Sequence, residues 1–149
     1  MALLAKGIWI VAAGGERALF LENIGTPDAP KLSLRERAES EGTGMELADR
    51  PGRMQDTGKQ QLSALEMTDH DQLARDRFAA QVAAKINKLV TKQGISRLVV
   101  VAPPHTLSVL RNEISDTARK AVMAEIDKDL THHPLEKIGT LVAADIERI

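Results

Sequence analysis

The stretch Arg97-Leu98-Val99-Val100-Val101-Ala102 is a run of apolar residues behind a single arginine, and Pro103-Pro104 end it. Such a run predicts a β-strand that is buried on both faces. A helical pattern precedes it from Asp71 to Gly94, with apolar residues at helical spacing at Phe78, Val82, Ile86 and Leu89. A strand that follows a long helix is expected to pair in parallel with an earlier strand, which predicts an α/β fold.

The N-terminal part of the chain predicts that earlier strand and two antiparallel partners. Gly7-Ile8-Trp9-Ile10-Val11-Ala12 is a second apolar run, and Gly14-Gly15 provide a tight turn behind it. Residues Arg17–Ile24 are expected to form the hairpin partner. After several turn residues, Lys31–Glu36 alternate between apolar and polar side chains, as expected of a half-exposed edge strand. Three antiparallel strands therefore open the domain.

The C-terminal part continues with helices and one ambiguous segment. Leu107, Leu110 and Ile114 share one face of a predicted helix, and a last helix is expected from Pro134 through Ile146. The segment Ala121–Leu130 fits both helical and alternating patterns, so periodicity leaves it open. The predicted fold class is α/β, a mixed sheet in which three N-terminal antiparallel strands are followed by the order αβαβα.

Composition limits the possible functions. The chain has 149 residues, the size of one domain, and its 43% apolar and 28% charged residues are typical of a globular protein. A net charge of -1 argues against a domain held to nucleic acid mainly by phosphate contacts. The lack of cysteine excludes disulfides, thiolate nucleophiles and cysteine-bound zinc, and it suits a reducing cytoplasm. No apolar window reaches the length of a membrane span, so we expect a cytoplasmic protein without a membrane partner.

The stretch from about residue 39 to about residue 64 is rich in glycine and poor in large apolar residues. It predicts a long flexible loop within the single domain 1–149, and loops of this length are often functional or disordered. Its basic residues are Arg50, Arg53 and Lys59, against five acidic residues. The loop is therefore not a polybasic arm.

Several short motifs resemble a known family. They are Asp49-Arg50-Pro51-Gly52-Arg53, Arg77-Phe78-Ala79 with Val82-Ala83, Val101-Ala102-Pro103-Pro104-His105-Thr106-Leu107, and Lys128-Asp129-Leu130-Thr131 with His133-Pro134. Their order and spacing are similar to the bacterial host-attachment protein family, nearly from end to end. That family is related to the bacterial archaeo-eukaryotic release factor-like family and resembles the middle domain of archaeal and eukaryotic class-1 release factors. The resemblance implies an RNase-H-like layout and favours a strand within Ala121–Leu130.

The same resemblance gives the long loop a role. In release factors the corresponding loop carries Gly-Gly-Gln and enters the peptidyl-transferase centre of the ribosome. This chain instead reads Asp56-Thr57-Gly58-Lys59-Gln60-Gln61, so hydrolysis of peptidyl-tRNA is not carried over. Relatives have arginine and glycine where this chain has His105 and Ser108. The change removes one cation from the loop after the apolar strand and weakens the case for a phosphate bound there.

Two polar clusters have the residue types of metal ligands. Asp69-His70-Asp71, with Asp49 or Asp145, contains the ligands of a hard-cation or mixed site. The alternative, which the sequence favours, is that these acids cap the N-terminus of the following helix. His132-His133 have no third histidine or cysteine nearby, so we expect a loop that caps the last helix rather than a zinc site.

The loop Pro103-Pro104-His105-Thr106 has the strongest positional argument for a ligand. It follows the carboxyl end of a predicted parallel strand and begins a helix, where free backbone N–H groups suit an anion. The alternative is that the two prolines only stiffen the turn and end the strand. Position in the fold does not decide between the two interpretations.

Two functional hypotheses follow, and the sequence favours the first. It is a non-enzymatic, cytoplasmic factor that needs no cofactor and binds the ribosome, tRNA or protein partners, with host attachment an indirect phenotype. Its expected contact residues are Arg50, Arg53, Lys59, Pro104, His105, Thr106 and Arg111. The second is a metal-dependent hydrolase, either a nuclease or an aminoacyl-ester hydrolase, that uses Asp69, His70 and Asp71. A surface adhesin is disfavoured because no export signal is evident.

Overall fold

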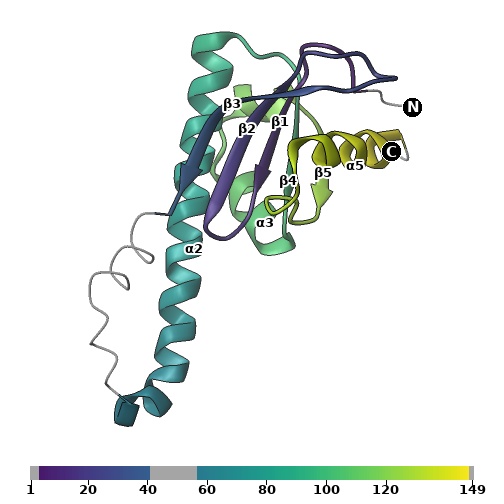
Figure 1. The fold of residues 1–149 in the computed structure, drawn as a ribbon. Coiled ribbons are helices and arrows are strands. Elements are labelled where there is room, and N and C mark those ends of the chain that lie inside the picture. The colour runs from purple at the N-terminus through teal and green to yellow at the C-terminus, as the bar shows by residue number, and fades with distance from the viewer. Residues whose placement is uncertain (1–3, 41–56, 148–149) are drawn as a thin grey trace.

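The described residues form a five-stranded mixed sheet with four helices packed on its two faces (Figure 1). The computed structural model describes the backbone of residues 4–40 and 57–147, and the side chains of residues 4–40 and 72–147. The elements in chain order are β1 (Trp9–Ala13), β2 (Arg17–Asn23), β3 (Leu32–Glu39), α2 (Thr57–Gln93), β4 (Leu98–Ala102), α3 (Pro104–Glu113), α4 (Asp116–Ala121), β5 (Val122–Asp127) and α5 (Leu135–Glu147). The predicted α/β class is confirmed.

The sheet has the strand order β3-β2-β1-β4-β5. β1 and β2 form an antiparallel hairpin, β3 pairs antiparallel with β2, and β1, β4 and β5 run parallel to one another. The pairing of β1 with β4, with Val11 opposite Val100, confirms the predicted crossover through a helix. As a consequence, the carboxyl ends of β1, β3, β4 and β5 all lie at one edge of the sheet.

The central strands are apolar throughout because helices cover both of their faces. On one face, Val11, Phe20 and Val100 pack with the buried residues of α2, α3 and α4. On the other face, Ile10 and Val99 pack with the buried residues of α5 and with Leu4. Successive strand residues therefore serve different cores, as the two-residue period of a strand requires.

Helix α2 is longer than the sequence predicts. It begins at Thr57 instead of near Asp71, because residues 57–71 contain no proline and several good helix formers. The expected loop from 39 to 64 is therefore wrong at both ends, since Glu39 belongs to β3 and residues 57–64 are helical; residues 41–56 lie outside the described residues. No helix in the described part of the chain combines the length and hydropathy needed to cross a membrane.

The ambiguous segment 121–130 contains the strand that the family resemblance favours. β5 covers Val122–Asp127, and its buried residues Ala124 and Ile126 follow the alternating pattern. A short helix that the sequence analysis does not predict, α4, precedes it. Its N-terminus is capped by Ser115, whose Oγ accepts a hydrogen bond of 3.1 Å from the backbone N–H of Ala118.

Candidate functional site

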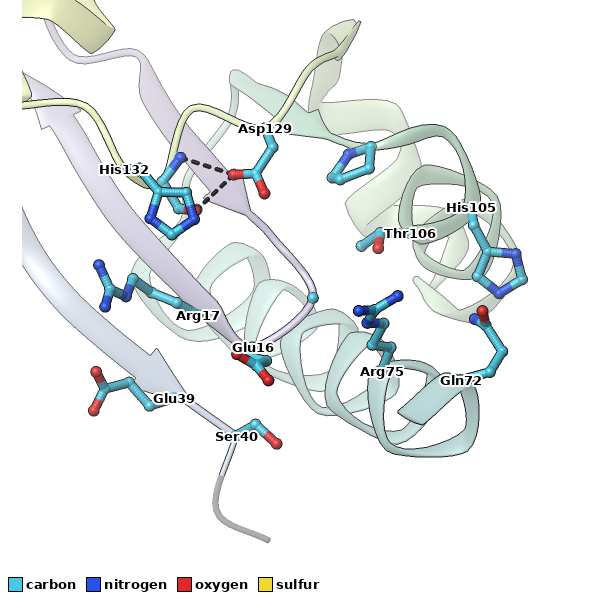
Figure 2. Close-up of a pocket in the computed structure, with 13 residues that line it drawn as sticks. Glu16, Arg17, Glu39, Ser40, Gln72, Arg75, His105, Thr106, Asp129 and His132 are labelled. Carbon is cyan, nitrogen blue, oxygen red and sulfur yellow. Dashed lines mark hydrogen bonds between the residues drawn. The ribbon is translucent and has the colours of Figure 1, made fainter. Parts of the chain in front are cut away.

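A cleft of about 780 Å³ opens at the edge where the parallel strands end (Figure 2). The loops that follow β1, β4 and β5 line it with Gly15, Pro103 and Asp129 respectively. The start of β2, the end of β3 and the side of α2 complete the wall. Ligands of α/β sheets bind at this edge because the loops there diverge above the strand ends. The topology of the sheet thus places the cleft.

Two glycines in the turn between β1 and β2 allow the walls of the cleft to approach one another. A Cβ atom on Gly14 would lie 2.9 Å from Oδ2 of Asp129, so the loop after β5 packs directly on this turn. A Cβ atom on Gly15 would lie 3.0 Å from Nε of Arg75, so the Arg75 side chain lies across the turn. Gly14 therefore leaves room for the Asp129 carboxylate, whereas the turn itself does not require glycine, because neither residue has a positive φ.

The cleft carries charges of both signs. Arg17 and Arg75 contribute cations, and Glu16, Glu39 and Asp129 contribute carboxylates. Oδ1 of Asp129 accepts hydrogen bonds from the backbone N–H and the hydroxyl of Thr131, at 3.0 and 2.6 Å. This local bonding holds one carboxylate oxygen in place at the end of β5.

His105 connects the start of α3 to α2. Its Nε2 lies 2.7 Å from Oδ1 of Asp76, and Nε2 of Gln72 donates a hydrogen bond of 3.1 Å to the same oxygen. The hydrogen bond with His105, followed by that with Gln72, lowers the pKa of Asp76 below its ordinary value of 3.8. His105 is exposed, so the contact lies at the rim of the cleft.

Replacing His105 with alanine is expected to raise the pKa of Asp76 toward 3.8, because the largest cause of its depression is removed. A carboxyl with a lowered folded pKa stabilises the fold above its unfolded pKa, and the contribution is lost as the pH falls through the folded pKa. The affected window therefore lies at and below about pH 3.8. Carbon-detected NMR titration of the Asp76 carboxyl measures the change, and exposed His133→Ala is the control. An unchanged pKa in His105→Ala would contradict the assignment.

Of the residues predicted to bind a ligand near the start of α3, two line the cleft and one lies away from it. His105 and Thr106 line the cleft, and Pro104 is the first residue of α3. Arg111 does not line it. Its Nη2 lies 2.5 Å from Oε1 of Glu125 on β5, and this hydrogen bond, with the opposite charge, raises the pKa of Arg111. Arg111 therefore acts in an exposed ion pair between α3 and β5.

The side chains of the long-loop residues that are predicted to bind a partner lie outside the described part of the structure. Arg50 and Arg53 lie outside the described residues, as does Asp49, and Lys59 lies in the first turn of α2, where only the backbone is described.

The prediction that Asp69-His70-Asp71 cap a helix is wrong, because these residues lie inside α2. Only the backbone of these three residues is described. Among the described side chains, no group of three histidine, cysteine or acidic residues could hold a metal ion. Asp145, one of the two further candidate ligands, forms an ion pair instead, with its Oδ2 2.9 Å from Nζ of Lys128.

The sequence analysis missed several residues of the cleft. Arg75 and Gln72, and Asp76 that bonds to His105 at the rim, look like ordinary exposed positions of an amphipathic helix, and no local signal distinguishes them. Asp129 had a usable signal, because it follows a segment that could form a parallel strand. The turn Gly14-Gly15 had a similar signal at the end of β1.

A comparison with protein families bears on the whole described site. The family model described as bacterial archaeo-eukaryotic release factor family 12 matches residues 7–142. The chain belongs to this family. No curated protein matches the chain. The match of release factor family 12 includes every strand, α2 and all residues that line the cleft. The release-factor part of the predicted resemblance is thereby confirmed, whereas the link to host attachment stays a prediction.

Proposed function

We propose that this member of release factor family 12 is a non-enzymatic, cytoplasmic factor that binds the ribosome or tRNA. The observation that carries the proposal is the family match over residues 7–142, taken with the sequence that begins α2. Thr57-Gly58-Lys59-Gln60-Gln61 stands at the start of the long helix, where the resemblance implies Gly-Gly-Gln. A chain that keeps the helix and lacks this catalytic segment is expected to bind without hydrolysing.

The shape of α2 supports this proposal. Its N-terminal part extends beyond the sheet (Figure 1), and among the side chains described from residue 72 onward, those that pack α2 in the core of this face lie between Phe78 and Val90. A helix of this length spans roughly 55 Å, which is enough to carry its tip into a recess that the sheet does not enter. Arg50, Arg53 and Lys59 would contact phosphates of the RNA there. Host attachment would then be an indirect consequence of a role in translation.

The alternative function, a metal-dependent hydrolase, has no comparable support. Its three predicted ligands lie in the interior of one helix, where only the backbone is described. Catalysis by a metal ion needs ligands that converge on one point, with an open position for water.

The proposal predicts that the intact, tagged chain recovers ribosomes or tRNA from lysate of its native cells. Replacing Arg50, Arg53 and Lys59 together by alanine is expected to weaken this recovery, because three phosphate contacts are lost. It should also reduce the salt dependence of binding, with a slope of log affinity against log salt lower by about three. Pull-down followed by analysis of RNA and ribosomal proteins, repeated at several salt concentrations, measures both effects.

A matched control removes three cations elsewhere. Lys88, Lys92 and Arg97 are exposed at the opposite end of α2 and beyond it, so their replacement changes the net charge equally. Recovery that falls only in the loop variant supports the proposal. Equal loss of recovery in both variants would show that binding depends only on the total positive charge of the chain. A preparation free of RNA and ribosomal protein would overturn the proposed function.

A further inference from the structure

The hydroxyl of Thr106 faces the cleft without a partner. Thr106 is only 6% exposed, it lines the cleft, and Figure 2 shows its side chain on the Arg75 side. No described residue forms a hydrogen bond with this hydroxyl. The hydroxyl oxygen is not among the buried, unsatisfied side-chain atoms of the described residues, so it opens into the cleft. The hydroxyl is therefore available to form a hydrogen bond with a ligand in the cleft.

The first turn of α3 offers further donors beside this hydroxyl. The N-cap residue, Pro103, makes no side-chain capping bond, and the first helical bond runs from the N–H of Leu107 to the carbonyl of Pro103. Pro104 has no N–H, so the backbone N–H groups of His105 and Thr106 lack partners within the helix. A helix N-terminus of this kind favours an anion, through its free donors and the helix dipole.

Arg75 provides a positive charge at the same end of the cleft. Its side chain lies across Gly15 and beside Thr106 in Figure 2, and it forms no ion pair with any described residue. Arg75 is exposed, and its guanidinium can form bidentate hydrogen bonds with a phosphate in the cleft. Three kinds of donor thus meet at the α3 end of the cleft.

The rest of the cleft has the opposite character. Glu16, Glu39 and Asp129 line it, and Oδ2 of Asp129 forms no hydrogen bond with a described residue. These carboxylates would repel a polyphosphate or a nucleic-acid backbone that filled the cleft. They favour a ligand that has one phosphate group and carries hydroxyl or amino donors on the remainder. A cleft of about 780 Å³ has room for such a molecule.

We propose that the cleft at the ends of β1, β4 and β5 binds a small phosphate monoester with hydroxyl or amino donors, such as a nucleoside monophosphate or a sugar phosphate. The phosphate accepts hydrogen bonds from Arg75, the Thr106 hydroxyl and the first-turn N–H groups of α3. Asp129 accepts hydrogen bonds from the donors of the ligand. The inference does not depend on the proposed role in translation, because Arg50, Arg53 and Lys59 are not among the residues that line this cleft.

The test is a ¹⁵N NMR titration of the full chain with adenosine 5′-monophosphate. Ribose 5-phosphate, adenosine and inorganic phosphate serve as comparison ligands. Both phosphate esters are expected to shift the amide signals of His105 and Thr106, with a dissociation constant of about 1 mM or lower. Arg75→Ala and Thr106→Val are each expected to weaken binding by about tenfold, because each removes a hydrogen bond to a charged group. The same spectra show whether each variant is folded.

Matched variants separate the proposed contacts from general effects. Arg77→Ala removes an exposed cation two positions further along α2, and Thr106→Ser keeps the hydroxyl; both should bind as the parent chain does. Asp129→Asn should weaken the esters and leave inorganic phosphate unaffected. Adenosine that binds as tightly as its monophosphate would overturn the proposal. Full affinity in Arg75→Ala, or no shift at about 10 mM ester, would overturn it as well.

Discussion

Replacing Phe20 with alanine is expected to lower the free energy of unfolding by about 3 to 5 kcal/mol. Phe20 lies in the middle of β2 opposite Val11 of β1 and has no exposed surface. Its ring belongs to the core between the sheet and α2, together with Phe78 and Val82. Truncation removes the buried ring and leaves a cavity, because the strand and the helix cannot collapse fully onto the space.

Urea unfolding followed by far-ultraviolet circular dichroism measures this effect. Leu73→Ala is the control, since Leu73 lies on α2 with 51% of its surface exposed and is expected to change the stability by less than about 1 kcal/mol. A loss below about 1 kcal/mol in Phe20→Ala would show that α2 does not depend on this core contact.

The same core contact matters for the cleft. Phe78 follows Arg75 and Asp76 by less than one turn of α2, so the packing of Phe78 on the sheet determines where these two side chains lie. Lys59 lies on the same helix, about 24 Å from Arg75 along the helix axis toward the N-terminus. α2 therefore connects the proposed partner-binding tip with the proposed ligand cleft while keeping them apart.

Much of the fold follows from hydrophobic pattern alone. The apolar runs 7–12 and 97–102 predict strands with two covered faces, and the helical spacing from Phe78 to Leu89 predicts the crossover that makes β1 and β4 parallel. These features are predictable because burial on both faces leaves no polar position in a strand. The alternation of apolar and polar residues predicts the edge strand β3 but not its inner face, because Leu34 is exposed next to a register shift in the pairing with β2.

The remaining features depend on tertiary contacts that no local pattern records. The start of α2 at Thr57 lies among residues with few large apolar side chains, so hydrophobic spacing could not locate it. The residues that line the cleft could not be located from local sequence patterns either. Arg75 reaches it because α2 crosses the turn at Gly15, and His105 reaches Asp76 because α3 begins beside α2. Residues far apart in the chain meet there, and only their position on the strand-end loops could be predicted.

Replacing Asn23 with alanine is the second change with a large expected effect, a loss of about 3 kcal/mol or more in the free energy of unfolding. Asn23 is completely buried at the end of β2. Its Nδ2 donates hydrogen bonds of 2.8 Å and 3.3 Å to the carbonyls of Leu4 and Ala5. Its Oδ1 accepts hydrogen bonds of 3.0 Å and 2.9 Å from the N–H groups of Gly25 and Lys31. The carbonyl of Ala5 also accepts a hydrogen bond from the N–H of Ile8, but alanine would remove the side-chain partner of the other three backbone groups. Unsatisfied buried groups cost more than the bonds themselves contribute.

The loop that Asn23 supports has little room to adjust. A Cβ atom on Gly25 would lie 2.4 Å from the carbonyl oxygen of Ala29, so the backbone there is already in close contact with itself. Urea unfolding compares Asn23→Ala with Asn112→Ala, an exposed asparagine on α3 whose loss should matter by less than about 0.5 kcal/mol. If the two variants unfold at the same urea concentration, backbone bonds alone hold the segments before β1 and β3. If only Asn23→Ala is destabilised, one buried amide joins both segments to the end of β2.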